Sequence, residues 1–332
     1  MNKPLVSIIM PVKNGLPYLP KTLDSIVNQT LSNWQLIIVD DHSLDSTWSW
    51  LKLNTKDERI SYFKNNGNGI IDALETAWQA CSGDYVTRMD ADDIMPEDKL
   101  AKLLTALNNA PENTVATGLV KYFKADDVVN DGYKQYEAWL NSNLLSENPY
   151  NQLFKECVIP SPAWMVKREV IMQLDGFKDL EYPEDYDLVF RFKQLGLTIK
   201  TVPSVIHFWR DHSTRASRND PNYAENSFLP LKIKWLLKMH PNTTFNIIGA
   251  GKKGKKIAQY LSASKVGFNW FTNNPKKLVV PIYGIELKEL KVYKQKNTIW
   301  IVAVANKQEQ KDIISEFDEQ NMVPGIDYLL FC

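Results

Sequence analysis

Short apolar runs alternate with segments whose apolar residues recur at helical spacing along the first third of the chain. The runs are nearly continuous, which is typical of strands that are buried on both faces of a sheet. They predict strands over residues 5–10, 34–39, 60–63 and 85–89, and the segments between them predict helices over 17–28, 46–53, 70–81 and 96–109. Strands that alternate with helices indicate a parallel, doubly wound α/β sheet.

The pattern is less regular in the middle of the chain and restarts near its end. We expect a helix within 133–145, a strand at 163–166, a helix at 184–195 and short strands at 197–202 and 205–209. After Pro241 the β-α-β pattern resumes with a strand at 244–248, a glycine-rich turn at 249–254 and further elements up to 320. Because 332 residues exceed one ordinary core, we predict an α/β domain over 1–222, a helical linker over 223–241 and a small Rossmann-like α/β domain over 242–332.

The composition excludes several classes of protein. The 39 basic residues balance 39 acidic residues, so the chain lacks the positive charge typical of a nucleic-acid-binding protein. Its three cysteines are odd in number and lack paired spacing, which is typical of free thiols in a reducing compartment. No apolar run reaches the length of a membrane-spanning helix. We therefore expect a cytoplasmic protein without nucleic-acid partners.

The fourth predicted strand runs into Asp90-Ala91-Asp92-Asp93. Residues two apart on a strand point to the same side, so Asp90 and Asp92 should face one site beyond the carboxyl end of a parallel strand, where α/β sheets bind ligands. Two carboxylates about 4 Å apart repel by about 4 kcal/mol at an effective dielectric of 20. A hard divalent cation would offset that repulsion and bridge to a diphosphate. The alternative is a solvated turn that caps the next helix.

The polar ends of the first two strands should gather at this same edge, and two further polar segments are candidates for the chemistry. Residues 11–14 follow the first strand and Asp40-Asp41 the second, although Asp and Asn are also ordinary turn residues. Glu184-Asp185 opens a predicted helix, where an acidic residue either caps the helix or acts as a general base. The segment 210–218 is basic and polar, and its arginines suit phosphate oxygens: Arg210, Arg215 and Arg218.

In this order and spacing, the motifs resemble the family 2 glycosyltransferases of the GT-A fold. The resemblance covers about residues 4–218 and rests on 6–14, 38–47, 90–93, 184–188 and 210–212. It implies that the backbone at Pro11 and the side chain of Asp41 hold the nucleotide base, and that Asp90 approaches the ribose. Two positions depart from the family pattern: Lys13 stands where an aromatic ring often stacks on the base, and His42 where glycine is common.

The same resemblance implies the chemistry. Asp92 would bind Mn²⁺ or Mg²⁺ together with His212, Arg210 would contact the donor, and Asp185 would be the general base of an inverting, hexosyltransferase-type reaction. The implied donor is a nucleoside diphosphate sugar, usually a UDP-sugar. The implied acceptor is a hydroxyl of a glycan or a lipid-linked glycan in surface polysaccharide synthesis.

Two other functions stay open. A sugar nucleotidyltransferase also uses a metal and an α/β nucleotide fold, but residues 12–16 do not supply its Gly-rich, Arg-containing loop. A nucleotide-sugar-binding regulatory or scaffolding protein would centre on the glycine-rich turn at 249–254, yet a pure binder has no use for a base such as Asp185. An NAD-binding site usually has an acidic residue that binds the ribose about 20 residues after its glycine-rich motif, and this sequence has none at that point. Thr272, Asn273 and Asn274 stand there.

Segment 231–238 mixes apolar and basic residues. It would either lie on the inner face of an anionic membrane or pack one domain on another, and we expect packing. Peripheral membrane association and self-association both stay open.

Overall fold

The computed structural model describes residues 5–124, 129–215 and 228–332, so Arg218 lies outside the described residues. The chain forms two compact units, and each is described by itself. Unit 1 comprises Met1–Asn148 and Ile159–Ala224, and unit 2 comprises Pro149–Val158 and Glu225–Cys332.

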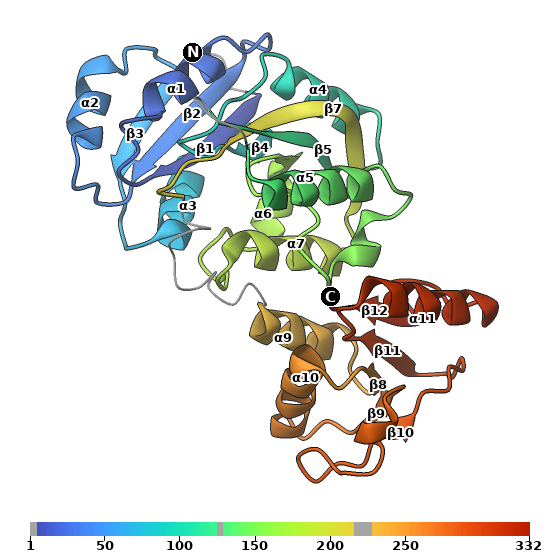
Figure 1. Cartoon of the computed structure of the whole chain (residues 1–332). Helices are drawn as coiled ribbons and strands as arrows, with labels where there is room; N and C mark the ends of the chain where they lie inside the picture. Colours follow the sequence, from blue (N-terminus) through green and yellow to red (C-terminus); the bar gives the residue numbers. More distant parts are fainter. Residues whose placement is uncertain (1–4, 125–128, 216–227) are drawn as a thin grey trace. The chain divides into compact units, whose positions relative to one another are not determined.

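Unit 1 is built on a seven-stranded sheet with the order β3-β2-β1-β4-β6-β5-β7 (Figure 1). Its strands are β1 Val6–Val12, β2 Trp34–Asp40, β3 Ile60–Lys64, β4 Tyr85–Arg88, β5 Thr114–Phe123, β6 Trp164–Lys167 and β7 Thr198–Arg210. Strands β1 to β4 pair in parallel, as do β5 and β7, whereas β6 runs antiparallel to both of its neighbours. The predicted mainly parallel α/β sheet is confirmed.

Helices cover both faces of this sheet. In Figure 1, α1 and α4 lie above it, and α3, α6 and α7 lie below it. The helices of unit 1 are α1 Leu19–Val27, α2 Thr47–Asn54, α3 Ile70–Gln79, α4 Lys99–Asn108, α5 Asp131–Leu144, α6 Arg168–Gln173 and α7 Glu184–Gln194. The central strands carry fully buried aliphatic residues at successive positions, as the continuous apolar runs predict. The strand ends therefore leave the core at one edge, where polar residues begin.

Two sequence predictions for unit 1 need correction. The ten-residue strand β5 was not expected, and it lies inside the sheet with Gly118 against the side chain of Ile206. The two short strands expected around Pro203 are one long strand, β7. Because β7 is an edge strand and its pairing with β5 is irregular where Gly118 and Leu119 meet it, the missing N–H of proline is tolerated there.

Unit 2 contains a five-stranded parallel sheet with the order β10-β9-β8-β11-β12. Its strands are β8 Thr244–Ile248, β9 Phe268–Thr272, β10 Lys288–Glu289, β11 Thr298–Val302 and β12 Tyr328–Leu330, and its helices are η1 Pro149–Gln152, α9 Leu229–Met239, α10 Lys252–Ala263, η3 Pro275–Lys277 and α11 Lys307–Glu319. The glycine-rich turn joins β8 to α10. Gly249 has φ +102°, and an added Cβ there would lie 2.9 Å from the Val304 side chain, so the turn requires glycine.

The amphipathic segment 231–238 lies in α9. Leu231, Ile233, Trp235 and Leu236 are buried, and α9 packs against α10. Lys232 is buried as well, and its ammonium donates to the carbonyl oxygen of Lys155. The segment thus packs inside unit 2, and packing of one domain on another stays a prediction. No helix among the described residues is both long and apolar enough to cross a membrane.

Candidate functional site

Asp41 lies just beyond β2 and is only 5% exposed. Its Oδ1 accepts hydrogen bonds from Asn65 Nδ2 at 2.7 Å and from the backbone N–H of Gly69 at 2.9 Å, and its Oδ2 pairs with Lys13 Nζ at 2.9 Å. Burial raises the pKa of Asp41, but the bonds from Asn65, Lys13 and Gly69 outweigh it and hold the pKa below its ordinary value. Pro11 lies on the neighbouring strand β1. The structure thus fixes a carboxylate beside the exposed cation of Lys13, where the family resemblance predicts the nucleotide base.

The acidic loop, residues 90–93, follows β4, and its carboxylates have different partners. Asp90 Oδ1 accepts from Arg88 Nε at 2.9 Å, and Asp92 Oδ2 lies 2.8 Å from His212 Nε2, 120 residues away in sequence. Arg210 holds the loop as well, because its Nε donates to the Asp92 carbonyl oxygen at 2.7 Å. The end of β4 and the end of β7 therefore bring four predicted site residues together.

Protonation of Asp92 is governed by opposing effects. Burial raises its pKa, whereas the hydrogen bond from His212 and the charge of Arg215 lower it, and the net pKa lies below the ordinary value. Asp92 is therefore a carboxylate at neutral pH, the form that binds metal ions.

Arg88 links the acidic loop to the first turn of α7. While its Nε holds Asp90, its Nη1 donates to Glu184 Oε1 at 2.9 Å, and Arg88 and Glu184 are only 6% and 4% exposed. Asp185 follows in the same turn. Burial and the charge of Glu184 raise the pKa of Asp185 to about 7, against a lowering by Arg88. A carboxyl group with a pKa near neutrality can accept and release a proton at physiological pH, as a general base must.

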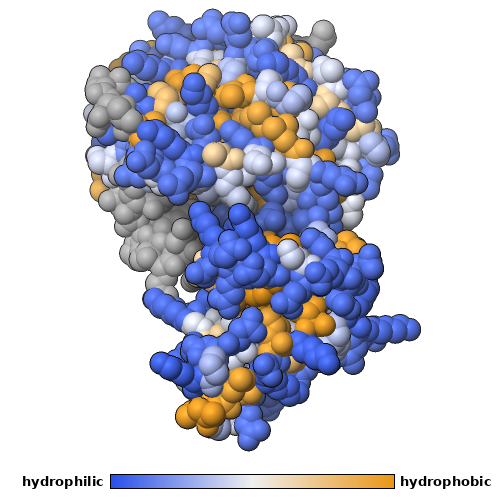
Figure 2. Space-filling view, turned by 45° about the vertical axis from the view of Figure 1, so that its right-hand side comes forward, coloured by the Kyte–Doolittle hydropathy of each residue, from blue (hydrophilic) through white to orange (hydrophobic). Residues whose placement is uncertain are grey.

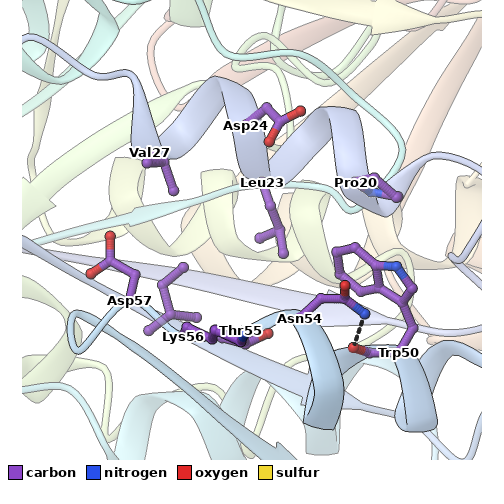
Figure 3. A pocket seen from close by; sticks show the side chains of 10 residues that line it. Pro20, Leu23, Asp24, Val27, Trp50, Asn54, Thr55, Lys56 and Asp57 are labelled. Carbon is purple, nitrogen blue, oxygen red and sulfur yellow. Dashed lines mark hydrogen bonds between the residues drawn. The ribbon is translucent and has the colours of Figure 1, made fainter.

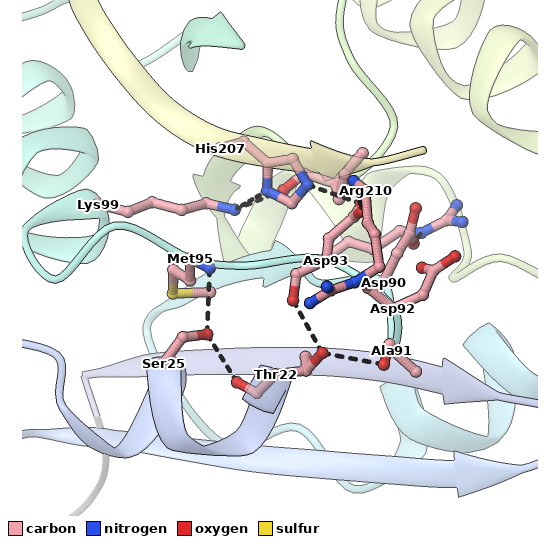
Figure 4. Close-up of polar contacts among 12 residues, drawn as sticks. Thr22, Ser25, Asp90, Ala91, Asp92, Asp93, Met95, Lys99, His207 and Arg210 are labelled. Carbon is pink, nitrogen blue, oxygen red and sulfur yellow. Dashed lines mark hydrogen bonds and ion pairs between the residues drawn. The ribbon is translucent and has the colours of Figure 1, made fainter. Parts of the chain in front are cut away.

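A fully buried network fixes the acidic loop on its other side (Figure 4). Asp93 Oδ2 lies 2.9 Å from His207 Nε2, and His207 Nδ1 lies 3.4 Å from Lys99 Nζ. Thr22 Oγ1 of α1 donates to two carbonyl oxygens of the loop, at 3.0 and 2.8 Å. Burial lowers the pKa of Lys99 to about 7 and the pKa of His207 well below its ordinary value. It raises the pKa of Asp93, as does the charge of Asp92.

A divalent metal at this edge would be held by Asp92 and His212. Mg²⁺ and similar cations are usually held by one or two protein ligands together with substrate phosphates. Across the described part of the chain, no three His, Cys, Asp or Glu side chains gather as a complete metal-binding group. Nη2 of Arg210 is buried and has no hydrogen-bond partner within the described residues, so a phosphate oxygen would satisfy it. The donor set fits a metal that is shared with a diphosphate.

A hollow of about 280 Å³ lies elsewhere in unit 1, between α1 and α2 (Figure 3). Leu23 and Trp50 line it together with polar residues such as Asn54. None of the residues of the acidic loop, of the Asp41 cluster or of α7 lines it. We therefore locate the candidate site at the strand ends and not in this hollow.

The family model described as glycosyl transferase family 2 matches residues 7–175, which include nearly all of β1, the whole of β2 and the acidic loop. The chain belongs to glycosyl transferase family 2. The family predicted from the motifs is therefore confirmed, and the protein is a glycosyltransferase.

Several curated relatives of this glycosyltransferase are bacterial. An uncharacterized glycosyltransferase from Haemophilus influenzae is 29% identical over 65% of this chain and 68% of that protein. The UDP-Glc:alpha-D-GlcNAc-diphosphoundecaprenol beta-1,3-glucosyltransferase WfaP from Escherichia coli is 27% identical over 65% of this chain and 80% of that protein. Other relatives are matched over as little as 22% of their own length.

Solved structures support the fold. Mannosyltransferase PcManGT from Pyrobaculum calidifontis, in complex with GDP-Man and Mn²⁺, matches 80% of this chain and 76% of that chain with a TM-score of 0.51 and 19% identity. The likeness shows the GT-A fold that the motifs predict.

Several residues of the site were not singled out in the sequence. Arg88, Asn65, Lys99 and His207 make the contacts that hold the predicted carboxylates in place. One signal was available for Arg88, a charged residue inside the apolar run that forms β4. Asn65 and His207 meet their partners only through the tertiary fold.

Proposed function

We propose that this glycosyltransferase moves a sugar, with inversion, from a UDP-sugar to a hydroxyl of a glycan or lipid-linked glycan in surface polysaccharide synthesis. The observation that carries the proposal is the Arg88 bridge between Asp90 and Glu184, because it ties the first turn of α7, which carries Asp185, to the loop of the candidate donor site. The relative WfaP uses UDP-Glc and a diphosphoundecaprenol-linked acceptor, according to its name. Family membership supports a glycosyltransferase over a sugar nucleotidyltransferase or a scaffold.

The donor base is proposed to lie against Pro11, Lys13 and Asp41. Uracil presents an N–H between two carbonyl groups. Asp41 Oδ2 can accept that N–H, while the Lys13 ammonium, which already lies 2.9 Å from this oxygen, donates to the neighbouring carbonyl. Lys13 is 58% exposed at its side chain and is therefore able to shift as the base enters. Asp90 would accept from the ribose hydroxyls.

The diphosphate is proposed to lie between Arg210 and the pair formed by Asp92 and His212. A bound Mn²⁺ or Mg²⁺ would withdraw charge from the leaving diphosphate. Arg210 would donate its buried Nη2 to a phosphate oxygen. The structure of PcManGT with GDP-Man and Mn²⁺ supports a divalent cation in this fold.

Asp185 is proposed to accept the proton of the acceptor hydroxyl as the new glycosidic bond forms. The hydroxyl oxygen attacks the anomeric carbon on the face opposite the diphosphate, which inverts the configuration. Asp187 lies two residues on along α7 and is unsuited to this role, because its Oδ2 already accepts from Arg191 Nε at 2.8 Å and from the Glu181 N–H at 3.0 Å.

The division of labour within the chain is part of the proposal. Residues 1–222 would form the catalytic domain, 223–241 the linker and 242–332 a domain for assembly or acceptor positioning. We place the reaction in the cytoplasm, at the inner face of the membrane if the acceptor is lipid-linked.

The test replaces Asp185 with Asn. Asp185→Asn should lower transfer to a soluble analogue of a GlcNAc-diphospholipid by about 10²–10⁴-fold, because a general base contributes that factor. The melting shift produced by UDP with Mn²⁺ should stay close to that of the wild type. Asp179→Asn, which removes an exposed carboxylate nearby, is the matched control. Undiminished transfer by Asp185→Asn would show that the base is assigned wrongly.

A further inference from the structure

The balanced charge of the chain hides a strong asymmetry along it. Residues 231–332 contain 16 basic and 8 acidic residues, whereas residues 1–230 contain 23 basic and 31 acidic ones. Within this part, residues 228–285 contain ten lysines and no acidic residue at all. This stretch includes α9, α10, β9 and the loop after β9. Most of these lysines are at least partly exposed, although Lys232 is buried and Glu289 of β10 pairs with Thr272 of β9. Such an excess of positive charge attracts a polyanion.

The loop after β9, residues 275–285, is named here the valine loop. It exposes apolar side chains that a soluble surface would usually bury: Val279 is 78% exposed and Val280 is 62% exposed. A tight turn follows, closed by two backbone hydrogen bonds of 3.0 Å between Ile282 and Ile285. Figure 2 shows hydrophobic surface beside hydrophilic side chains at the lower end of unit 2.

The turn places an aromatic ring at the tip of the loop. Tyr283 and Gly284 are its central residues and have φ values of +55° and +75°, as a two-residue hairpin turn requires. A non-glycine residue with positive φ is uncommon, and here it holds Tyr283 with 57% exposure. Tyrosine rings with one wet and one apolar end are enriched where membranes meet water.

Lysines lie directly beside these apolar residues. Lys276 and Lys277 precede the valine pair, and Lys276 is exposed. Lys277 Nζ donates to the carbonyl oxygen of Ala250 at 2.8 Å, which fixes the valine loop beside the start of α10. Lys252, the exposed first residue of α10, therefore lies near the same end of the unit. Cations and protruding apolar side chains thus occur together.

We propose that the valine loop and its neighbouring lysines dock unit 2 on an anionic lipid surface. Val279 and Val280 enter the boundary between headgroups and acyl chains, Tyr283 lies at headgroup level, and Lys252 and Lys276 contact the anionic headgroups. A nucleic acid would use the lysines but not the exposed valines. A second copy facing this surface would present the same lysines and be repelled.

The test is cosedimentation of the full-length protein with vesicles of phosphatidylcholine, with and without phosphatidylglycerol, in the absence of donor and acceptor. We expect binding to the phosphatidylglycerol vesicles that weakens as salt is added. The double variant V279S/V280S should bind at least about tenfold more weakly. Lys276→Glu should bind more weakly by at least about fivefold.

Matched controls are available in the same unit. Ile326→Ser removes an apolar residue that is 65% exposed but lies outside the valine loop, and Lys311→Glu reverses an exposed charge on α11. Both should bind the vesicles like the wild type. Each of three outcomes would overturn the proposal. The first is equal vesicle binding by V279S/V280S and the wild type, and the second is no preference for phosphatidylglycerol. The third is a change of oligomeric state in place of vesicle binding. Since no sugar transfer is measured, the outcome is independent of the catalytic proposal.

Discussion

Removing Arg88 should change both the stability of the protein and the pH at which it works. Arg88 and Glu184 are 6% and 4% exposed, and their contact is 2.9 Å long. Arg88→Met leaves the Glu184 carboxylate buried without its counter-charge, which costs about 3–5 kcal/mol of unfolding free energy for a buried pair. The control is Lys178→Met, which breaks the ion pair with Asp175, whose side chains are 52% and 76% exposed. It should change the free energy of unfolding by less than about 1 kcal/mol.

The effect on catalysis follows from the pKa of Asp185. Glu184 raises this pKa and Arg88 lowers it, and the balance lies at about 7. Arg88→Met should therefore move the acidic limb of the kcat/KM profile to higher pH, because a smaller fraction of Asp185 is ionised at any given pH. Glu184→Gln removes the neighbouring negative charge and should move the limb to lower pH. The double variant Arg88→Met/Glu184→Gln should have a free energy of unfolding about 1–3 kcal/mol higher than the two single changes predict when added together.

The measurement combines urea unfolding with kcat/KM between pH 5 and 9 for the wild type, the two single variants and the double variant. kcat/KM reports groups of the free enzyme, so the limb is read directly as the titration of the base. The acidic limb of the kcat/KM profile could instead move in the same direction in both single variants, or stay in place. Either result would refute the assignment of Asp185 and its electrostatic control by Arg88.

Two further predictions concern stability. Burial lowers the pKa of Lys99 from 10.5 to about 7. Between these two pH values the unfolded chain binds a proton that the folded chain lacks. The free energy of unfolding should therefore rise with pH, by up to about 1.4 kcal/mol per pH unit. In urea unfolding between pH 7 and 9, the free energy of unfolding should rise less steeply with pH for Lys99→Met than for the wild type, whereas Lys102→Met should behave like the wild type. Equal pH dependence of Lys99→Met and the wild type would contradict the burial argument. Gly176 has φ +79°, and an added Cβ would lie 2.4 Å from Glu75 Oε2 and 2.9 Å from Trp78 Cδ1. Gly176→Ala should thus lower the free energy of unfolding by about 2 kcal/mol or more. Gly196 has φ +75° but open space around it, so Gly196→Ala should lower this free energy by only about 1 kcal/mol. A lower melting temperature for Gly196→Ala than for Gly176→Ala would be incompatible with this geometry.

The strand ends were predictable because a parallel sheet imposes their position. The buried runs that form β1, β2 and β4 stop where polar residues begin, so Asp41 and the acidic loop had to reach one edge. Strand β5 escaped prediction because its apolar residues are interrupted by threonines and Gly118, which pack well only beside β6 and β7. The contact of Arg88 with Glu184 spans 96 residues, and no local pattern encodes a pair that depends on where α7 packs.

The charge balance of the acidic loop gives its carboxylates a different meaning from the one the sequence suggests. From the sequence, the repulsion between Asp90 and Asp92 calls for a metal. In the structure Asp90 is paired with Arg88, Asp92 with His212, and Asp93 with His207. The charge of Arg88 therefore offsets part of the repulsion, and the hydrogen bonds to His212 and His207 hold the loop in place through the fold. A metal would then be needed only with the diphosphate, whose charge the Asp92–His212 pair and the unsatisfied Nη2 of Arg210 would meet.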